Sequence, residues 1–432
     1  MGGMQLGAGI SAGDTAWMLV ATALVLMMTP ALGLFYSGLV RSKSTLNTFM
    51  MSVAALGVVT VTWALIGYSL AFDHGGSLVG GLRYALLHDV NFAPQPGTAI
   101  PRLVFWAFEA SFAIITAALI SGAVVERMRF GAFLVFITAW SIVVYPVLAH
   151  WVWGGGWLQH NGTLDFAGGV PVEMGSGFSA FAAALVVGPR RDYHRQALLP
   201  HNAVYVLLGA GLLWFGWFGF NGGSGFSVGH PSVLAFTNTL LCPACTLVVW
   251  FGLDLVRERR ITAIGAATAI VVGCVGITPA AGYISPLLAM ALGAVAALPS
   301  YALIVWRPRT RLDESLDVLA AHGTAGMTGI LFTGLAAQLS WNGVANGLFF
   351  GHAAQLGWQA LAALAGPAYA FIATFILLRL VGLVMPLRAD DRQQAVGMDV
   401  AEHGEEAYTT GEGAILVAHD EERSESLAPS LS

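Results

Sequence analysis

The chain has 432 residues, of which 56% are hydrophobic and only 10% are charged, with a formal net charge of −5 and a mean hydropathy of +0.72. Soluble proteins carry about 25% charged residues, so this composition excludes a soluble enzyme, a nucleic-acid-binding protein and a disordered chain. We expect an all-α integral membrane protein that crosses the lipid bilayer of the cell membrane many times.

Eleven runs are long and apolar enough to cross the hydrocarbon core as helices, which takes about 20 residues each. In chain order they are residues 16–39, 47–72, 103–125, 131–153, 168–188, 199–220, 232–255, 262–281, 286–306, 318–338 and 357–385. The links between them are short and carry turn residues or charge clusters. We therefore expect a single membrane domain over residues 1–386.

The basic residues of the loops predict the orientation of this domain. Thirteen Lys and Arg residues lie in one set of loops, whereas only Arg83 and Arg102 lie in the opposite set. Because cytoplasmic loops carry the excess of basic residues, we expect the N-terminus outside and the C-terminus inside. Residues 387–432 then form an acidic cytoplasmic tail, and its composition from about Glu412 onward predicts disorder.

Charged side chains within membrane spans are costly and usually serve a transport pathway or an ion pair. Glu109 lies in the third run and has no partner nearby in the sequence, so the sequence leaves its role unexplained. Asp254 lies three residues before Arg257 at the cytoplasmic end of the seventh run, and we expect these two residues to pair.

Two pairs of ionisable residues share one spacing. Asp165 precedes Glu173 by eight residues, and Glu314 precedes His322 by eight residues. On a helix this spacing places both members on one face, about 12 Å apart. One pair opens a span that runs inward and the other a span that runs outward, which predicts an inverted repeat of five plus five spans with the eleventh left over. Matching depth favours a pathway role for Glu173 and His322, whereas a helix cap is the simpler interpretation of Asp165.

Six blocks of the sequence resemble the ammonium transporter (Amt/Mep/Rh) family, on its Amt/Mep side. They are DTAWMLVATALVLMMTPALGLFYSGLVRSK (14–43), AHWVWGGGWLQHNGTLDFAGG (149–169), GWFGFNGGS (216–224), GITPAAGY (276–283), DVLAAHG (317–323) and DVAEHGEEAY (399–408). Two positions depart from the family pattern. Glu173 occupies the place of the first of two pore histidines, and Glu109 stands where relatives commonly carry Gln.

The resemblance implies an outer recruitment site for ammonium or methylammonium made of Phe112, Trp153 and Ser224. It also implies that Phe112 and Phe220 stack as a hydrophobic pore gate, beyond which ammonia moves without its extra proton. Without the resemblance, Trp153 is better interpreted as an aromatic residue of the membrane interface, and Phe112 as ordinary core packing.

Deeper in the pore, the resemblance implies that Glu173 and His322 face one another and titrate as a coupled unit. The sequence leaves open whether they form an ionic or a neutral pair. Supporting roles are implied for Asp165, Asp317, Phe108 and Trp217. We expect no cofactor and no metal site, because Cys242-Pro-Ala-Cys245 lacks a further set of ligands. We also expect no enzymatic activity, because the pore pair lacks a nucleophile.

The resemblance further implies a homotrimer with one pore in each subunit. Residues 397–408 match the family's cytoplasmic tail, and a PII-type signalling protein is an implied partner at that face. Two other functions stay open. One is an ammonium sensor or transceptor that uses the same binding site, and the other is a Rhesus-type gas channel that moves no net charge.

Overall fold

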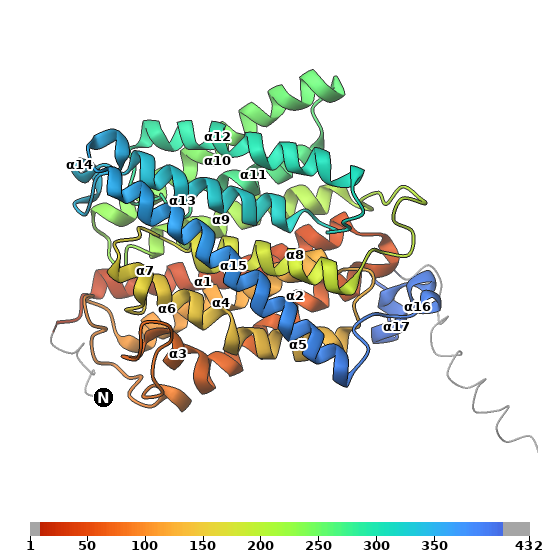
Figure 1. Cartoon of the computed structure of the whole chain (residues 1–432), viewed down its shortest axis with the longest axis horizontal. Helices are drawn as coiled ribbons and strands as arrows, with labels where there is room; N and C mark the ends of the chain where they lie inside the picture. Colours follow the sequence, from red (N-terminus) through yellow and green to blue (C-terminus); the bar gives the residue numbers. More distant parts are fainter. Residues whose placement is uncertain (1–8, 409–432) are drawn as a thin grey trace, which may run out of the picture.

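The computed structural model describes residues 9–408, which fold into one bundle of helices (Figure 1). Within these residues no β-strand is present beyond two isolated bridges, so the all-helical prediction is confirmed. The disorder predicted from about Glu412 lies outside the described residues. The elements are α1 (Ala12–Leu39), η1 (Ser42–Ser44), α2 (Thr45–Thr62), η2 (Trp63–Gly67), α3 (Tyr68–Phe72), η3 (Ala85–Leu87), α4 (Arg102–Ile120), η4 (Ser121–Ala123), α5 (Phe130–Val143), α6 (Tyr145–Val152), α7 (Trp157–His160), η5 (Gly169–Met174), α8 (Gly175–Val187), α9 (Ala203–Gly223), α10 (His230–Glu258), α11 (Ala263–Ile277), α12 (Pro286–Trp306), η6 (Arg307–Arg309), η7 (Leu319–Thr324), α13 (Ala325–Ala336), α14 (Leu339–Asn342), η8 (Leu348–Phe350), α15 (Ala353–Val384), α16 (Asp391–Val396) and α17 (Met398–His403).

Nine helical segments among the described residues are long and apolar enough to cross a membrane. They coincide with nine of the eleven predicted runs. The other two runs, 262–281 and 318–338, contain the shorter α11 and the continuous pair η7 and α13. Each predicted run is therefore helical, although α11 has only 15 residues.

Polar residues fix where several of these helices begin. The Ser11 side chain accepts the N–H of Asp14 at the start of α1. The Asn202 side chain accepts two backbone N–H groups at the start of α9, and Thr262 accepts one at the start of α11. Such caps satisfy N–H groups that have no partner inside the helix. The apolar sequence that follows each cap has little polar face, which is typical of membrane helices.

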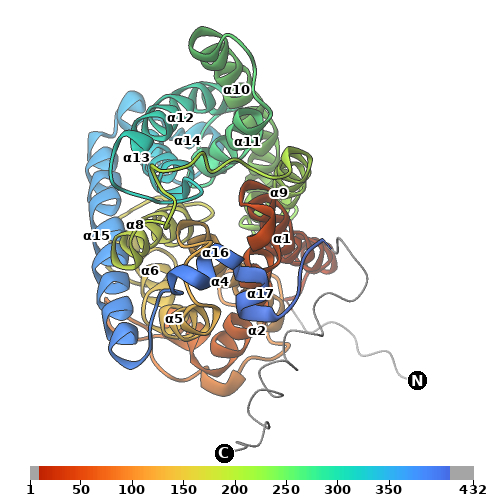
Figure 2. The ribbon, with the colours of Figure 1, turned by 90° about the vertical axis from the view of Figure 1, so that its right-hand side faces the viewer.

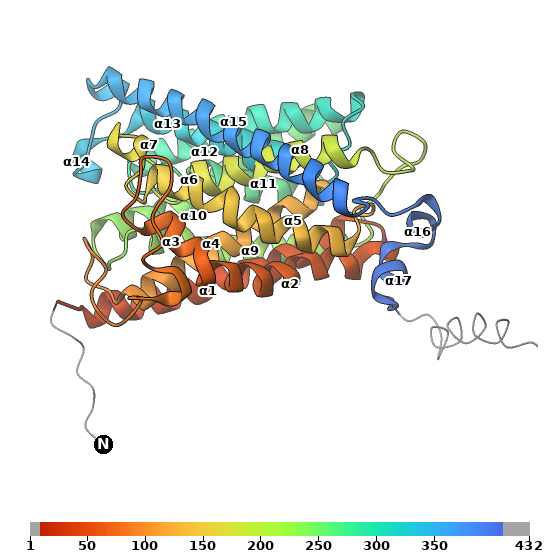
Figure 3. The same cartoon turned by 60° about the horizontal axis from the view of Figure 1, so that its bottom comes forward.

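The helices run side by side, with the tail at one end of the bundle. The helix α1 packs along α9, and α10 packs against α11 and α12. The long α15 crosses the outside of the bundle obliquely and contacts α5, α8 and α13 (Figure 3). Viewed from the end, α16 and α17 lie across the bundle, and α17 contacts α2 (Figure 2).

Two segments with the same local geometry carry the predicted pore residues. Glu173 lies in η5 and His322 lies in η7, and both segments are π-helical turns that lead into α-helices. Each residue follows a left-handed backbone position by five residues, namely Gly168 with φ 112° and Asp317 with φ 59°. Wide π turns are rare and concentrate at functional sites. The two segments also contact one another.

Asp165 and Glu314 do not share a helix face with the pore residues, so the prediction that each pair lies on one helix face is wrong. The chain that follows each of them is not helical until just before η5 and η7 begin. Both carboxylates instead accept backbone N–H groups at the start of the next segment. They are caps that fix where the two π turns start.

Glycines let the segment of η5 and α8 approach the segment of η7 and α13 closely. An added Cβ at Gly177 would lie 2.3 Å from the amide nitrogen of Gly323, and one at Gly326 would lie 2.6 Å from Cβ of Glu173. Gly177 follows Glu173 by four residues, and Gly326 follows His322 by four residues. Small residues at such crossings allow helix backbones to pack together.

The expected pairing of Asp254 with Arg257 is wrong. The Asp254 carboxylate accepts the backbone N–H of Thr262 at 3.1 Å and its hydroxyl at 2.8 Å. Arg257 forms its ion pair with Glu258 at 2.9 Å. Asp254 therefore anchors the start of α11, because Thr262 caps that helix.

A candidate transport pore

Three cavities follow one another, and the middle one shares lining residues with the inner one. The outer cavity has a volume of about 680 Å³ and is lined by Phe112 among others. Phe112 stacks on Phe220, which lines a middle cavity of only about 10 Å³. His322 lines both this middle cavity and an inner cavity of about 380 Å³. The arrangement is that of two wide cavities on either side of a narrow one.

All three predicted recruitment residues line the outer cavity. The Trp153 indole stands edge-on to Phe112, with ring centroids 6.3 Å apart, and its N–H donates to the carbonyl of Asp165 at 2.9 Å. The Ser224 hydroxyl donates to the carbonyl of Phe220 at 2.9 Å. Its oxygen keeps lone pairs as acceptors, so aromatic faces and a hydroxyl acceptor lie in one cavity.

Asp165 orders the backbone beside this cavity. Its Oδ1 accepts the N–H groups of Gly168 and Gly169 at 3.0 and 2.7 Å, and its Oδ2 accepts that of Val170 at 2.7 Å. Burial raises the pKa of Asp165 to about 6, and the three backbone hydrogen bonds oppose that rise. The side chain thus fixes the turn into η5, while its carbonyl holds Trp153.

The predicted gate is a stack of two buried rings. The centroids of Phe112 and Phe220 lie 4.1 Å apart at an interplanar angle of 26°. Phe108 packs on Phe112 at 4.8 Å, and Trp217 packs on Phe220 at 5.4 Å. The Trp217 indole is held in turn by a 2.9 Å hydrogen bond to Thr278. Phe108 and Trp217 therefore back the two gate rings from either side.

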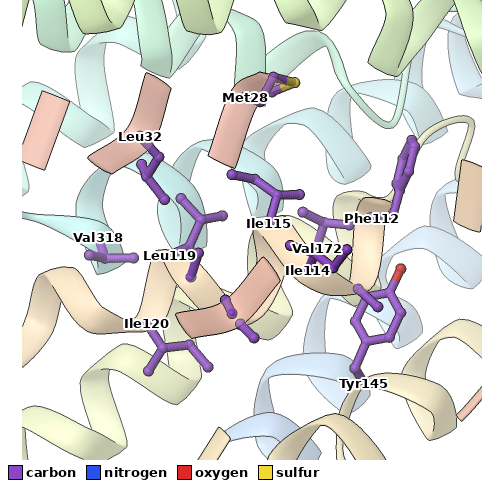
Figure 4. Close-up of a cluster of buried hydrophobic side chains, with 14 of the residues drawn as sticks. Met28, Leu32, Phe112, Ile114, Ile115, Leu119, Ile120, Tyr145, Val172 and Val318 are labelled. Atoms are coloured by element: carbon purple, nitrogen blue, oxygen red, sulfur yellow. The ribbon is translucent and has the colours of Figure 1, made fainter. Parts of the chain in front are cut away.

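Beyond the gate the lumen is apolar and narrow. Besides the gate and the acid–imidazole pair, its lining is Met28, Leu32, Ile115, Leu119, Val172, Leu213, Trp217 and Val271. Figure 4 shows several of these side chains, with Met28 and Leu32 facing the branched side chains of Ile115 and Leu119. A volume of about 10 Å³ has room for about one water molecule. A hydrated cation does not fit in this space.

Glu173 and His322 meet inside this lumen. The Nδ1 of His322 lies 2.8 Å from Oε2 of Glu173, and the two residues are 3% and 0% exposed. The Oε1 of Glu173 has no hydrogen-bond partner among the described residues. A proton shared between an acid and an imidazole can move between them without large rearrangement. The pair can therefore hold a proton, and the Oε1 of Glu173 can accept a further hydrogen bond.

The inner cavity contains the predicted supporting residue Asp317 and also Tyr36, which the sequence did not single out. Tyr36 lines it, and its hydroxyl donates to the carbonyl of Leu119 at 3.0 Å. Asp317 also lines it and pairs with Arg307 at 2.6 Å. Tyr36 lies within the first block that resembles the family, and this position was the only sequence feature that could have indicated a functional role for it. Nothing in the sequence predicted the pair of Arg307 with Asp317, which are ten residues apart in a loop.

A buried ion-pair network joins the loops at the end of the bundle where the tail lies. Arg190 binds Glu126 and Asp313 at 2.9 Å each, and Arg41 binds Glu126 at 2.8 Å. Burial raises the pKa of Glu126, but the guanidinium groups of Arg190 and Arg41 lower it by more, so that it lies below its ordinary value of 4.5. The basic loops that predicted the orientation are thus also structural.

The tail binds the same end of the bundle. The Asp399 carboxylate accepts the N–H groups of Leu46 and Asn47 near the start of α2, at 3.0 and 2.7 Å. Glu402 accepts the N–H of Phe130 at the start of α5, at 3.0 Å. Carboxylates at helix N-termini are favoured by unsatisfied N–H groups and by the helix dipole.

Comparisons with known proteins agree on one family. The model of the Ammonium Transporter Family matches residues 16–408. The chain is 41% identical over 399 residues to the ammonium transporter of Bacillus subtilis (strain 168), covering 92% of this chain and 98% of that relative. The crystal structure of Saccharomyces cerevisiae Mep2 superposes with a TM-score of 0.87 at 33% identity, covering 95% of this chain and 94% of the other. That of Candida albicans Mep2 gives a TM-score of 0.86 at 34% identity, covering 90% and 89%.

Proposed function

The chain belongs to the ammonium transporter family and is a multi-pass membrane protein that transports ammonium, and from this premise we propose how its pore selects and moves the substrate. The observation that supports the proposal is the order in which the sites follow one another along one path. An aromatic vestibule is followed by a stacked gate, and the gate by an apolar lumen that holds an acid–imidazole pair.

The outer cavity recruits the ammonium cation. Phe112 and Trp153 offer aromatic faces that attract a cation by about 0.5–2 kcal/mol each, and more when water is excluded. The Ser224 oxygen accepts a hydrogen bond from the cation. These residues line one cavity, which supports the outer site that the family resemblance implied.

The gate and the lumen require the cation to lose a proton. Phe112 and Phe220 leave no open path between the cavities they line, and the lumen beyond them is too small for a hydration shell. A bare ion in an apolar constriction is very unfavourable. Potassium resembles ammonium in size but has no proton to give up, so a path that admits only ammonia rejects potassium. Asp165 orients the vestibule in this mechanism and is not assigned as the base.

Glu173, in the place of the first pore histidine, changes how the lumen handles protons. A neutral imidazole pair offers only nitrogen atoms to passing ammonia. A carboxyl group that shares a proton with His322 adds an acidic partner and couples the titration of both residues. We propose that the pH dependence of transport therefore differs from that of a pore with two histidines.

Transport by the reconstituted protein tests this mechanism. Currents on solid-supported membranes are measured after pulses of ammonium and of potassium, for wild type and for Glu173→His, between pH 5 and 8. We expect current with ammonium and none with potassium, and a pH profile that shifts in the variant. Potassium currents of equal size would refute the gate, and superimposable pH profiles would refute the role of Glu173. Uptake of methylammonium without any current would favour the electroneutral, Rhesus-type alternative.

We also propose eleven spans with the N-terminus outside, an inverted five-plus-five repeat and a homotrimeric assembly. The matched features of η5 and η7 support the repeat, and family membership supports the trimer. The division into a membrane domain (1–386) and a cytoplasmic tail (387–432) is supported by α16 and α17, which lie outside the long helices. A PII-type protein is the proposed partner of the face that this tail occupies.

A further inference from the structure

Glu109 is a buried carboxylate that the mechanism above does not use. It is 4% exposed, and its buried Oε2 has no hydrogen-bond partner among the described residues. It nevertheless lines the outer cavity, from the same helix as Phe112 and three residues before it. Leaving a buried carboxyl oxygen without a donor is costly. Oε2 is enclosed by the protein, so the oxygen that can meet a solute at the cavity wall is Oε1, which accepts no hydrogen bond from the described residues either.

A comparison with the second carboxylate of this cavity sharpens the inference. Asp165 also lines the outer cavity, but three backbone N–H groups already occupy its oxygens. Among the described residues that line the cavity, none is a Lys or Arg, and the only basic side chains are His74 and His160. The cavity therefore holds a carboxyl acceptor that no lysine or arginine of its lining pairs with.

We propose that Glu109 is a direct ligand of the incoming cation, with a carboxylate oxygen accepting an N–H from ammonium or methylammonium. This inference rests on the proposed recruitment site. Aromatic faces stabilise the positive charge but accept hydrogen bonds poorly, and Ser224 accepts one. The four N–H groups of ammonium need further acceptors once water is displaced, and a hydrogen bond donated by a cation to a carboxyl oxygen is charge-assisted. Glu109 thus adds affinity and selects cations that carry N–H groups.

Two variants separate this role from a structural one. Glu109→Gln keeps the size of the side chain and removes its charge. Glu314→Gln is the matched control, because Glu314 is also fully buried with an unpartnered Oε1, but does not line the outer cavity. Ammonium affinity is measured as displacement of radiolabelled methylammonium from purified protein, and KM and maximal current are measured after reconstitution.

We expect Glu109→Gln to weaken ammonium binding and raise KM by about tenfold, the change expected for one charge-assisted bond. Its maximal current should stay within about twofold of wild type, and Glu314→Gln should bind ammonium as wild type does. Equal affinity of wild type and Glu109→Gln would overturn the inference, as would an equal loss in Glu314→Gln. The binding assay does not depend on transport. A wild-type protein that carries no ammonium current would therefore refute the proposed transport mechanism, whereas the role of Glu109 as a ligand would still be tested by the binding data.

Discussion

Replacing Gly177 with alanine perturbs the close crossing of α8 and η7. A Cβ atom at this position would lie 2.3 Å from the amide nitrogen of Gly323 and 2.5 Å from its Cα. Ordinary van der Waals contact begins near 3.4 Å, so the two backbones must separate by about 1 Å. Gly323 directly follows His322, so the imidazole moves with that backbone.

The size of this displacement sets the expected loss. The Nδ1 of His322 lies 2.8 Å from Oε2 of Glu173, and a further separation of about 1 Å takes the pair beyond hydrogen-bond distance. Misplacing reacting groups by this amount costs up to about 100-fold in rate. Overpacking of this kind costs about 1–3 kcal/mol of stability, which a folded protein survives. We expect ammonium-evoked current to fall at least about tenfold in Gly177→Ala.

The assay is the ammonium-evoked current of reconstituted protein, normalised to the amount of protein inserted. Gly252→Ala provides the control, because it is the same substitution within a long helix and its added Cβ meets nothing within 4 Å. That variant should carry wild-type current, since alanine suits a helix better than glycine. A Gly177→Ala protein with current within twofold of wild type would falsify the link between the glycine crossing and the pore pair.

Three further predictions concern the gate, the ion-pair network and the tail. Phe220→Ala removes one ring of the stack, and we expect potassium pulses to evoke currents that the wild type excludes; no potassium current would mean that the gate lies elsewhere. Glu126→Gln breaks a buried pair with Arg190, and we expect the free energy of unfolding to fall by about 3 kcal/mol, seen as a lower unfolding midpoint in detergent. The control is Glu258→Gln, which removes an exposed pair and should change the midpoint little. Because the pKa of Glu126 is lowered in the folded protein, its stabilisation is complete above about pH 4.5 and is lost as the pH falls through the folded-state pKa. The unfolding midpoint of wild type should therefore fall more steeply with acid than that of Glu126→Gln. Asp399→Asn offers one oxygen to two backbone donors, and we expect limited proteolysis to cut the tail faster; an unchanged rate would show that these bonds do not hold it.

The sequence by itself determined the helical membrane architecture, because in lipid each apolar run must satisfy its backbone hydrogen bonds within itself. The resemblance also predicted the gate and pore residues, of which Phe220 and His322 lie in the recognisable blocks. The pairing of Asp254 failed, because the sequence distance to Arg257 does not say which way a side chain at a helix end points.

Only the tertiary structure decided which residues meet. The contact of Glu173 with His322 joins segments 149 residues apart, and it depends on glycines that let two backbones cross without intervening side chains. The unpartnered oxygen of Glu109 can likewise be recognised only in the folded structure. Whether a side chain lacks a hydrogen-bond partner depends on every segment that packs around it. Local patterns fix helices because their hydrogen bonds are local, whereas a pore is the space left between helices, and its shape follows from how they pack.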